Sequence, residues 1–315
     1  MPASVGSILI VTYNSAGSIE ICVRALVHDP NWEIIIIDNA SQDQTVQLIK
    51  KHQPRVRLVQ NSSNAGFAAA VNQGVRTAQG DILLVLNPDC VAREGTLDRL
   101  AEIFIDPKVM TVGGLLIGPD GQPQKGFVLR RFPTLARMLS EIFLLNRVWP
   151  SNPWNRRYRC LELDYAKGQE ADQPAGACLA FRREVWQRVG GFDESFFPVW
   201  FEDVDFCRRI RDAGMKILYS PKVLFTHVGA HSVGLLPYVE RQLYWYANLQ
   251  RYFRKHHLAL ELSVLRLGIV IGLILRSFLA FLGAKPEGVG RLEAIRAHVK
   301  VICSLNETDI CPPRT

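Results

Sequence analysis

The sequence lacks the features that mark several classes of protein. Its seven cysteines are scattered, odd in number and without a CxxC pair, which argues against a disulfide framework and against a zinc cluster. The first residues contain no basic stretch followed by a long apolar run, so we expect no secretory signal and a cytoplasmic location. Internal repeats and low-complexity tracts are also missing. What remains is the composition of a globular chain, with 48% hydrophobic and 21% charged residues.

The charge is unevenly distributed along the 315 residues. The net charge is +7, and the segment from Arg241 to Lys300 accounts for all of it, with ten Lys and Arg against three Glu. Such a basic segment is typical of proteins that bind an anionic membrane surface. Nucleic acid is not expected as a partner, because no RNA-binding or zinc-finger signature is present and the basic residues alternate with aliphatic side chains.

Short apolar runs and helical patterns alternate in the first part of the chain. Strands are predicted at residues 7–11, 33–37, 56–60 and 81–86, and helices at residues 18–27, 44–52 and 65–77. This alternation predicts an α/β fold with a mostly parallel sheet flanked by helices. Polar clusters follow three of these strands, at residues 12–14, 38–41 and 87–89. Because ligands of open α/β sheets bind beyond the carboxyl ends of strands, we expect one shared site there.

The last third of the sequence predicts helices. An aromatic and basic helix is expected between Pro237 and His257, followed by an aliphatic stretch over residues 258–284. That stretch is long enough to cross the ~30 Å core of a bilayer. It contains Glu261, Arg266 and Arg276, which fall on one side of a helix, so a helix lying in the membrane interface is favoured over a straight span. The alternative is a helix packed on protein or at a dimer interface.

Acidic residues and one histidine are the candidates for chemistry. Asp89 ends the segment Asn87-Pro88-Asp89 directly after an apolar strand, where a carboxylate can reach a divalent cation, although the segment also suits an ordinary turn. Residues 202, 203 and 205 are all acidic and open a predicted helix, which is more than the helix dipole requires and predicts an aimed general base. His227 follows another apolar run and is either a metal ligand or a structural histidine.

Taken together, ordered segments between residues 7 and 233 resemble the inverting family 2 glycosyltransferases of the GT-A fold, in particular their bacterial rhamnosyltransferase-like branch. The segments are Val11-Thr12-Tyr13-Asn14, Ile37-Asp38-Asn39-Ala40-Ser41, Asn64-Ala65-Gly66-Phe67, Asn87-Pro88-Asp89, Gly176-Ala177-Cys178, Gly190-Gly191-Phe192-Asp193, Phe201-Glu202-Asp203-Val204-Asp205 and His227. The sequence departs from the family's metal-binding DxD motif at Asn87, where many members have Asp.

The resemblance implies roles for these residues. Asp38 matches the acid that meets the nucleotide base, and Asp89 matches the last acid of the DxD motif. Asp203 matches the catalytic base, with Glu202 as the alternative holder of that role, and His227 matches a position that ligates the metal in some relatives. The other implied nucleotide-sugar contacts are Thr12, Asn14, Asn64, Gly66 and Asn87. The implied cofactor is a divalent metal, Mg²⁺ or Mn²⁺.

The expected function is inverting transfer of a sugar, with rhamnose as one candidate, from a nucleotide-sugar donor to a saccharide or polyprenyl-linked acceptor at the inner face of the cell membrane. Residues 1–117 would bind the nucleotide-sugar, residues 118–236 would complete the catalytic domain on the acceptor side, and residues 237–315 would form a helical extension. The irregular middle of the chain offers acceptor candidates, namely Arg130, Arg131, Trp154 and Tyr158. The alternatives are a nucleotidyltransferase and a non-catalytic binding protein with the same fold.

Overall fold

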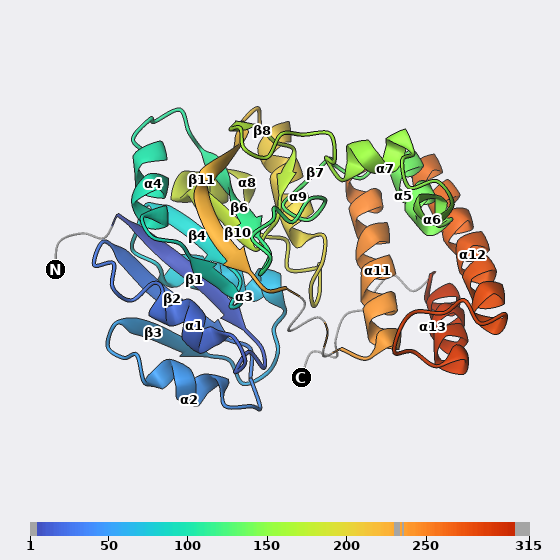
Figure 1. Ribbon diagram of the computed structural model, residues 1–315, viewed down its shortest axis with the longest axis horizontal. Coiled ribbons are helices and arrows are strands. Elements are labelled where there is room, and N and C mark those ends of the chain that lie inside the picture. Colours follow the sequence, from blue (N-terminus) through green and yellow to red (C-terminus); the bar gives the residue numbers. More distant parts are fainter. Residues whose placement is uncertain (1–4, 230–233, 235, 306–315) are drawn as a thin grey trace. The chain divides into compact units, whose positions relative to one another are not determined.

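The computed structural model describes residues 5–229, 234 and 236–305, and the chain divides into two compact units (Figure 1). Unit 1 contains residues 1–132, 159–194 and 202–232, whereas unit 2 contains residues 133–158, 195–201 and 233–315. Unit 2 is therefore formed by two segments from the middle of the sequence together with its last third. A domain boundary at residue 236 stays a prediction.

A mixed sheet forms the centre of unit 1. Its strands, in spatial order, are β3 (Val56–Gln60), β2 (Trp32–Asp38), β1 (Gly6–Thr12), β4 (Ile82–Leu86), β10 (Cys178–Arg182), β6 (Thr111–Ile117), β11 (Ile217–His227) and β5 (Cys90–Ala92), with β8 (Gln169–Glu170) beside β11. The first four of these strands are parallel, as the sequence predicts, and β10 runs antiparallel to both of its neighbours. A separate ladder joins β7 (Leu129–Arg130) to β9 (Gln173–Pro174).

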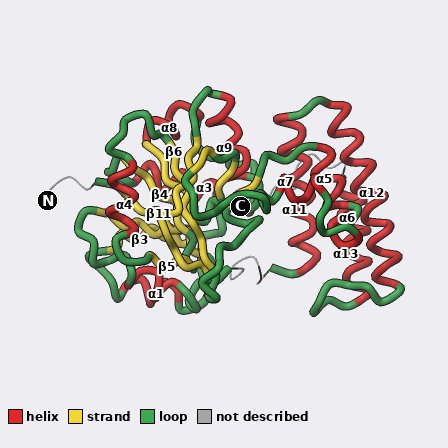
Figure 2. Tube along the Cα trace, turned by 45° about the horizontal axis from the view of Figure 1, so that its top comes forward, coloured by secondary structure: helices red, strands yellow, loops and turns green. Residues whose placement is uncertain are grey.

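Helices cover both faces of this sheet (Figures 1 and 2). One face packs against α1 (Ile19–Arg24), α2 (Thr45–Lys50) and α4 (Thr96–Ile103), and the other against α3 (Phe67–Thr77), α8 (Arg183–Val189) and α9 (Glu202–Asp212). Because side chains alternate along a strand, Ile8 and Ile10 of β1 enter the first core and Leu9 and Val11 the second. This burial on both faces is why the strands read as continuous apolar runs.

Unit 2 is built from helices over its described residues (Figure 2). They are α5 (Leu135–Ile142), α6 (Leu145–Val148), α7 (Pro153–Tyr158), α11 (Tyr238–His256), α12 (Ala259–Phe281) and α13 (Arg291–Ser304). The long apolar helix α12 packs against α5, α11 and α13. Gly268 and Gly272 permit its close approach to α5, because a Cβ added at either glycine would collide with a side chain of that helix. The helices predicted after Pro237 and over the aliphatic stretch are confirmed.

Candidate active site

The first polar cluster of the site joins the carboxyl ends of β1 and β2. Thr12 Oγ1 donates to Asp38 Oδ1 at 2.9 Å, and the Ser41 N–H donates to Asp38 Oδ2 at 2.9 Å. Asn14 enters the same cluster, since its N–H donates to Ser41 Oγ at 2.9 Å and its side-chain oxygen accepts from the Gln42 N–H at 2.8 Å. Thr12 is fully buried and Asp38 is 1% exposed, so the Thr12 hydroxyl orients the Asp38 carboxylate.

A second loop approaches this cluster before helix α3. Asn39 donates from Nδ2 to the Gly66 carbonyl at 3.2 Å, and Asn64 Oδ1 accepts from the Gly66 N–H at 2.9 Å. Gly66 has φ 84°, a backbone conformation that disfavours a side chain, and it is the residue immediately before α3. The structure thus brings Asn64 and Gly66 to the ends of β1 and β2, where the sequence predicts a nucleotide site.

Asp89, which follows β4, meets His227, the last residue of β11. Strands β5 and β11 are antiparallel and pair Cys90 with His227, which places the neighbouring Asp89 beside the imidazole. Asp89 Oδ1 lies 3.4 Å from His227 Nε2, and the Gly229 N–H donates to Asp89 Oδ2 at 2.9 Å. Burial alone would raise the pKa of Asp89, but the hydrogen bond and charge of His227, together with the Gly229 N–H, lower it overall. Asp89 is therefore held as a carboxylate.

This pair has the donor set of a divalent metal site. The ligand atoms of Asp89, Cys90 and His227 all lie within 4.8 Å of one another. Oxygen and imidazole nitrogen suit Mg²⁺, Mn²⁺ or a similar ion. Cys90 fits such an ion less well, because its fully buried thiol donates to the Ala177 carbonyl at 3.4 Å and burial, with the nearby Asp89 charge, raises its pKa well above the ordinary value. The residues present fit a metal ion held by Asp89 and His227.

Asp203 lies in the first turn of α9, where backbone donors hold its carboxylate. The Gly176 N–H donates to Oδ2 at 2.9 Å, and the Val204 N–H donates to Oδ1 at 2.8 Å. Gln173 Nε2 is a further donor, at 3.3 Å from Oδ2. Burial raises the pKa of Asp203, and these backbone hydrogen bonds and the charge of Arg130 offset only part of that rise. A partly exposed carboxylate with a raised pKa is suited to accept a proton.

The chain next to Gly176 connects Asp203, the predicted general base, to the loop that carries Asp89. The Asn87 N–H donates to the Ala177 carbonyl at 3.0 Å, so the loop carrying Asp89 is bonded to the residue next to Gly176. Gly176 has little room for a side chain, because a Cβ there would lie 3.0 Å from the Cβ of Asp203. These contacts explain why a glycine stands at position 176. They also bring Asp203 and Asp89 toward the same ends of the adjacent strands β4 and β10.

Glu202, the alternative base, has a different environment. It is 4% exposed, and its Oε2 has no hydrogen-bond partner among the described residues. Burial, with a further contribution from the charge of Asp203, raises the pKa of Glu202 well above its ordinary value. Burial therefore favours the protonated form of Glu202, which makes Asp203 the better candidate for the base.

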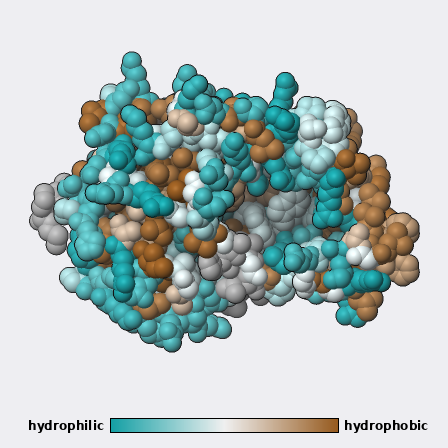
Figure 3. All heavy atoms as spheres, in the orientation of Figure 1, coloured by the Kyte–Doolittle hydropathy of each residue, from teal (hydrophilic) through white to brown (hydrophobic). Residues whose placement is uncertain are grey.

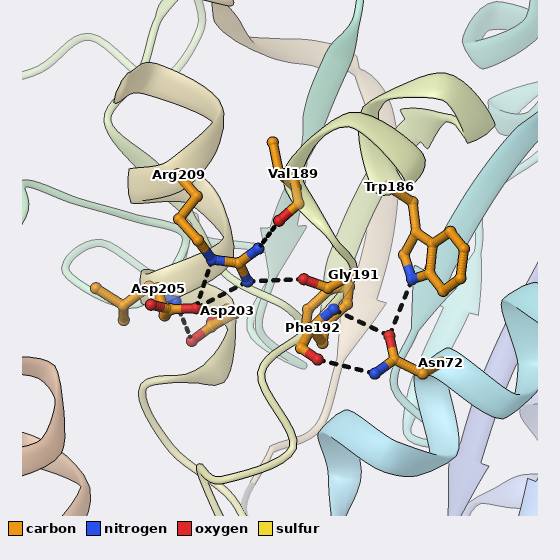
Figure 4. A network of polar contacts seen from close by, with 9 residues as sticks. Asn72, Trp186, Val189, Gly191, Phe192, Asp203, Asp205 and Arg209 are labelled. Carbon is orange, nitrogen blue, oxygen red and sulfur yellow. Dashed lines mark hydrogen bonds and ion pairs between the residues drawn. The ribbon is translucent and has the colours of Figure 1, made fainter. Parts of the chain in front are cut away.

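The third acid of the segment, Asp205, is a structural anchor (Figure 4). It is fully buried and forms an ion pair with Arg209 at 2.8 Å, while Arg209 also donates to the Gly191 carbonyl at 2.7 Å. From the other side, Asn72 of α3 donates to the Phe192 carbonyl at 2.8 Å and accepts from the Phe192 N–H at 2.9 Å. The turn at residues 190–193 is therefore clamped between α3 and α9, and the clamp fixes the helix turn that carries Asp203.

The predicted acceptor residues fall into different surroundings. Arg130 lies near enough to Asp203 for its charge to lower the pKa of that carboxyl, whereas Arg131 is in an ion pair with Asp172 at 3.7 Å. Trp154 is 45% exposed in unit 2 and contacts Trp149 edge to face. Tyr158 is 7% exposed, so its ring offers little surface for stacking on a sugar. An acceptor role for any of these four residues stays a prediction.

Sequence reasoning missed two glutamines and one aromatic ring of this site. Gln173 contacts Asp203, while Gln124 and Phe127 contact His227. Gln124 and Phe127 come from an irregular segment, and Gln173 lies in the two-residue strand β9, so none has a periodic pattern around it. The only local signal is the Gly-Pro-Asp-Gly turn at residues 118–121, which predicts a chain reversal and not a contact with a strand over 100 residues away.

Comparison with known proteins identifies the family. The model described as Glycosyl transferase family 2 matches residues 7–190, and the one described as Glycosyl transferase family group 2 matches residues 166–286. The N-acetylglucosaminyl-diphospho-decaprenol L-rhamnosyltransferase of Mycobacterium tuberculosis is 30% identical over 244 residues, which are 73% of this chain and 78% of the relative. Rhamnosyltransferase WbbL of Escherichia coli K12 is 24% identical over 210 residues, or 64% of this chain and 75% of the relative.

Solved structures show the same fold. The mannosyltransferase PcManGT from Pyrobaculum calidifontis, in complex with GDP-Man and Mn²⁺, aligns with a TM-score of 0.55 at 18% identity, over 95% of this chain and 87% of that chain. This likeness establishes the GT-A fold that the sequence predicts. Since the family 2 model matches more than half of the chain and a relative at 30% identity spans most of it, the chain belongs to glycosyl transferase family 2.

Proposed function

We propose that this enzyme transfers a deoxyhexose, rhamnose in the first instance, from a nucleotide-sugar to a lipid-linked saccharide, with inversion at the anomeric carbon. The substrate class follows the activity for which the Mycobacterium tuberculosis relative is named, that of an N-acetylglucosaminyl-diphospho-decaprenol L-rhamnosyltransferase. The observation that carries the chemistry is the aimed carboxylate of Asp203, bonded through Gly176 and Ala177 to the loop of Asp89.

The proposed reaction needs one displacement. Asp203 takes the proton from an acceptor hydroxyl while the hydroxyl oxygen bonds to the anomeric carbon, and the bond from that carbon to the donor's diphosphate breaks. The raised pKa of Asp203 favours this proton transfer, and Gly176 and Gln173 hold the carboxylate in position. A divalent ion bound by Asp89 and His227 would neutralise charge on the leaving nucleoside diphosphate. Asp38 and its partners Thr12 and Asn14 would hold the nucleoside.

A donor and acceptor screen tests this function. Purified full-length protein is incubated with dTDP-rhamnose, UDP-hexoses and GDP-mannose, each with a short polyprenyl-diphosphate N-acetylglucosamine and Mg²⁺ or Mn²⁺. We expect transfer with dTDP-rhamnose and loss of transfer in Asp203→Asn. Transfer from a UDP-hexose alone would overturn the choice of sugar and keep the enzyme class. Donor binding without transfer to any acceptor would instead support the non-catalytic alternative.

We further propose that helix α12 attaches the enzyme to an anionic membrane surface. It is the one described helix long and apolar enough to cross a membrane, and 33% of its most apolar window is buried within the protein. Its exposed side is almost entirely apolar, and Figure 3 shows this hydrophobic surface at the right edge of the view. The exposed side chains include Leu260, Leu267, Ile271, Ile274, Phe278 and Phe281, which are between 47% and 73% exposed.

Both arginines of α12 bond to neighbouring helices of unit 2. Arg276 donates to the Glu141 and Ile142 carbonyls at the end of α5, and Arg266 donates to Gln250 of α11 at 2.9 Å. The outer side of the helix can therefore enter the acyl region without burying either charge. Arg254 and Lys255, both exposed, precede the helix and would add about 1 kcal/mol each near anionic lipid.

Flotation with vesicles containing about 30% phosphatidylserine or phosphatidylglycerol tests this attachment. The wild type should float at low salt, and a triple variant with Leu267, Ile274 and Phe278 changed to Glu should stay at the bottom. Ile105→Glu, at a residue 78% exposed in unit 1, is the matched control and should float. Equal flotation of the triple variant and the wild type would leave α12 as an ordinary packed helix.

A further inference from the structure

The side chain of Gln124 contacts His227 twice. Its Nε2 donates to the His227 backbone carbonyl at 2.8 Å, and its Oε1 lies 2.8 Å from the ring nitrogen Nδ1. A carbonyl can only accept a hydrogen bond, so the first contact fixes which end of the Gln124 amide is the donor. The oxygen end then faces Nδ1, and only a protonated Nδ1 can complete that hydrogen bond. Gln124 therefore selects the Nδ1–H form of the ring.

The other ring nitrogen faces Asp89. In a neutral imidazole with its proton on Nδ1, Nε2 carries a lone pair. This lone pair and Asp89 Oδ1 point toward each other over 3.4 Å, while Asp89 Oδ2 is taken by the Gly229 N–H. Two acceptor atoms that converge in this way repel each other unless a cation lies between them. That cation is either a proton on Nε2, which makes the ring an imidazolium hydrogen-bonded to Asp89, or a metal ion that takes the place of this proton. With metal–ligand bonds of about 2.1 Å, two ligands of one ion lie roughly 3.0–3.4 Å apart, for bond angles between square and tetrahedral.

The residues around Gln124 hold the arrangement rigidly. The Gln124 N–H donates to the Leu116 carbonyl of β6 at 3.0 Å, and the Gly118 N–H donates to the Gln122 carbonyl at 2.9 Å, which closes the preceding turn. Phe127 stacks on the His227 ring, with centroids 5.0 Å apart and an interplanar angle of 6°. The plane of the imidazole is set by Phe127 and its rotation by Gln124, so the direction of Nε2 is fixed before any ion arrives.

We propose that Gln124 is a positioning residue that holds His227 with Nε2 available to a divalent ion, so that Asp89 and His227 form a two-residue metal site prepared in advance. The inference rests on the proposed use of a metal in sugar transfer. It assigns a role to the segment after β6, which the sequence left unassigned. A supporting residue of this kind acts through the ligand it orients, and its loss lowers metal affinity about 10- to 100-fold.

The test compares two changes at Gln124 with a matched control. Gln124→Met removes both contacts to His227, whereas Gln124→Glu keeps an oxygen that can accept from Nδ1–H. Gln122→Met makes the same chemical change at an exposed neighbour in the same turn. Mn²⁺ binding to each purified full-length protein is measured by electron paramagnetic resonance without nucleotide. We expect about 10- to 100-fold weaker binding in Gln124→Met, near wild-type binding in Gln124→Glu and wild-type binding in Gln122→Met.

Nitrogen NMR of the metal-free protein reads the tautomer directly. The signals of His227 are assigned by their loss in His227→Gln, and the wild type should carry a proton on Nδ1. Gln124→Met should shift the ring toward the Nε2–H form, which a merely structural role of Gln124 would not do. A wild-type ring without a proton on Nδ1, or equal Mn²⁺ binding in Gln124→Met and wild type, would overturn the proposal.

A separate result would overturn the metal site itself. If Asp89→Ala and His227→Ala both bind Mn²⁺ as the wild type does, the ion binds elsewhere, and the proposed function loses its metal site. If these two variants lose Mn²⁺ while Gln124→Met keeps it, the metal site stands and only the role of Gln124 fails.

Discussion

Replacing Asp203 with Asn should abolish most sugar transfer while leaving the protein folded. The amide has one acceptor oxygen, so it cannot satisfy both the Val204 N–H and the Gly176 N–H that the carboxylate accepts at 2.8 and 2.9 Å. A lost hydrogen bond to a charged group costs about 1.5–3 kcal/mol. Burial raises the pKa of Asp203 because it disfavours the charged form, so a neutral amide at this position offsets part of that cost. We therefore expect a net loss of about 2 kcal/mol or less in the free energy of unfolding.

The effect on turnover should be larger. A positioned general base contributes about 10²- to 10⁴-fold in rate, which corresponds to about 2.7–5.4 kcal/mol of transition-state stabilisation. The assay is the initial rate of transfer, with donor affinity measured separately by calorimetry and folding by urea unfolding. Asp212→Asn, in an exposed ion pair with Arg208 at the other end of α9, is the matched control and should keep the wild-type rate.

The pH dependence gives a second reading of the same residue. Because the pKa of Asp203 is raised and only the carboxylate accepts a proton, transfer should fall with decreasing pH through a midpoint above about 3.9, the ordinary value for aspartate. Asp203→Asn should lose this acid limb. Unchanged turnover in Asp203→Asn would refute the reasoning, and a large loss confined to Glu202→Gln would move the role to Glu202.

Three further predictions follow from named contacts. Asp89→Ala should bind nucleoside diphosphate equally well with and without Mn²⁺ in calorimetry, whereas Mn²⁺ should strengthen binding to the wild type; a metal effect of the same size in both would remove Asp89 from the ligand set. Arg209→Met should lower the free energy of unfolding by about 3–5 kcal/mol in a urea titration, because it leaves the fully buried Asp205 without its ion pair. Arg208→Met removes an exposed ion pair and should cost about 1 kcal/mol or less in the same titration. Similar losses in the two arginine variants would show that the clamp at Gly191 is unimportant. The pKa of Asp89 is lowered in the fold, so its contribution to stability is complete above about pH 4 and is lost as the pH falls through the lower folded-state pKa. The difference in the free energy of unfolding between the wild type and Asp89→Asn should therefore shrink between about pH 6 and pH 3. A difference that grows over this range would contradict this sign.

The sequence by itself determined the main features of unit 1. The apolar runs at residues 7–11 and 33–37 became β1 and β2 because strands buried on both faces need apolar side chains at every position. Parallel strands end at one edge of a sheet, so the polar residues after each strand had to gather there, as Thr12 and Asp38 do. Local pattern was sufficient for these features because each depends on neighbours in sequence or on the direction of the strands.

The tertiary structure decided which of the candidate residues act together. Asp205 is one of three acids at the start of α9, and its burial against Arg209 makes it an anchor. The pKa of Asp203 is raised by burial in the folded chain, which no local pattern encodes. The sequence placed the charges of α12 on one side, but only the packing on α5 and α11 showed that Arg266 and Arg276 bond to protein groups. Gln124 lies 103 residues from His227, and their contact depends on the pairing of β6 with β11. Burial and long-range pairing arise from the folded chain as a whole, which is why these roles could not be predicted from sequence.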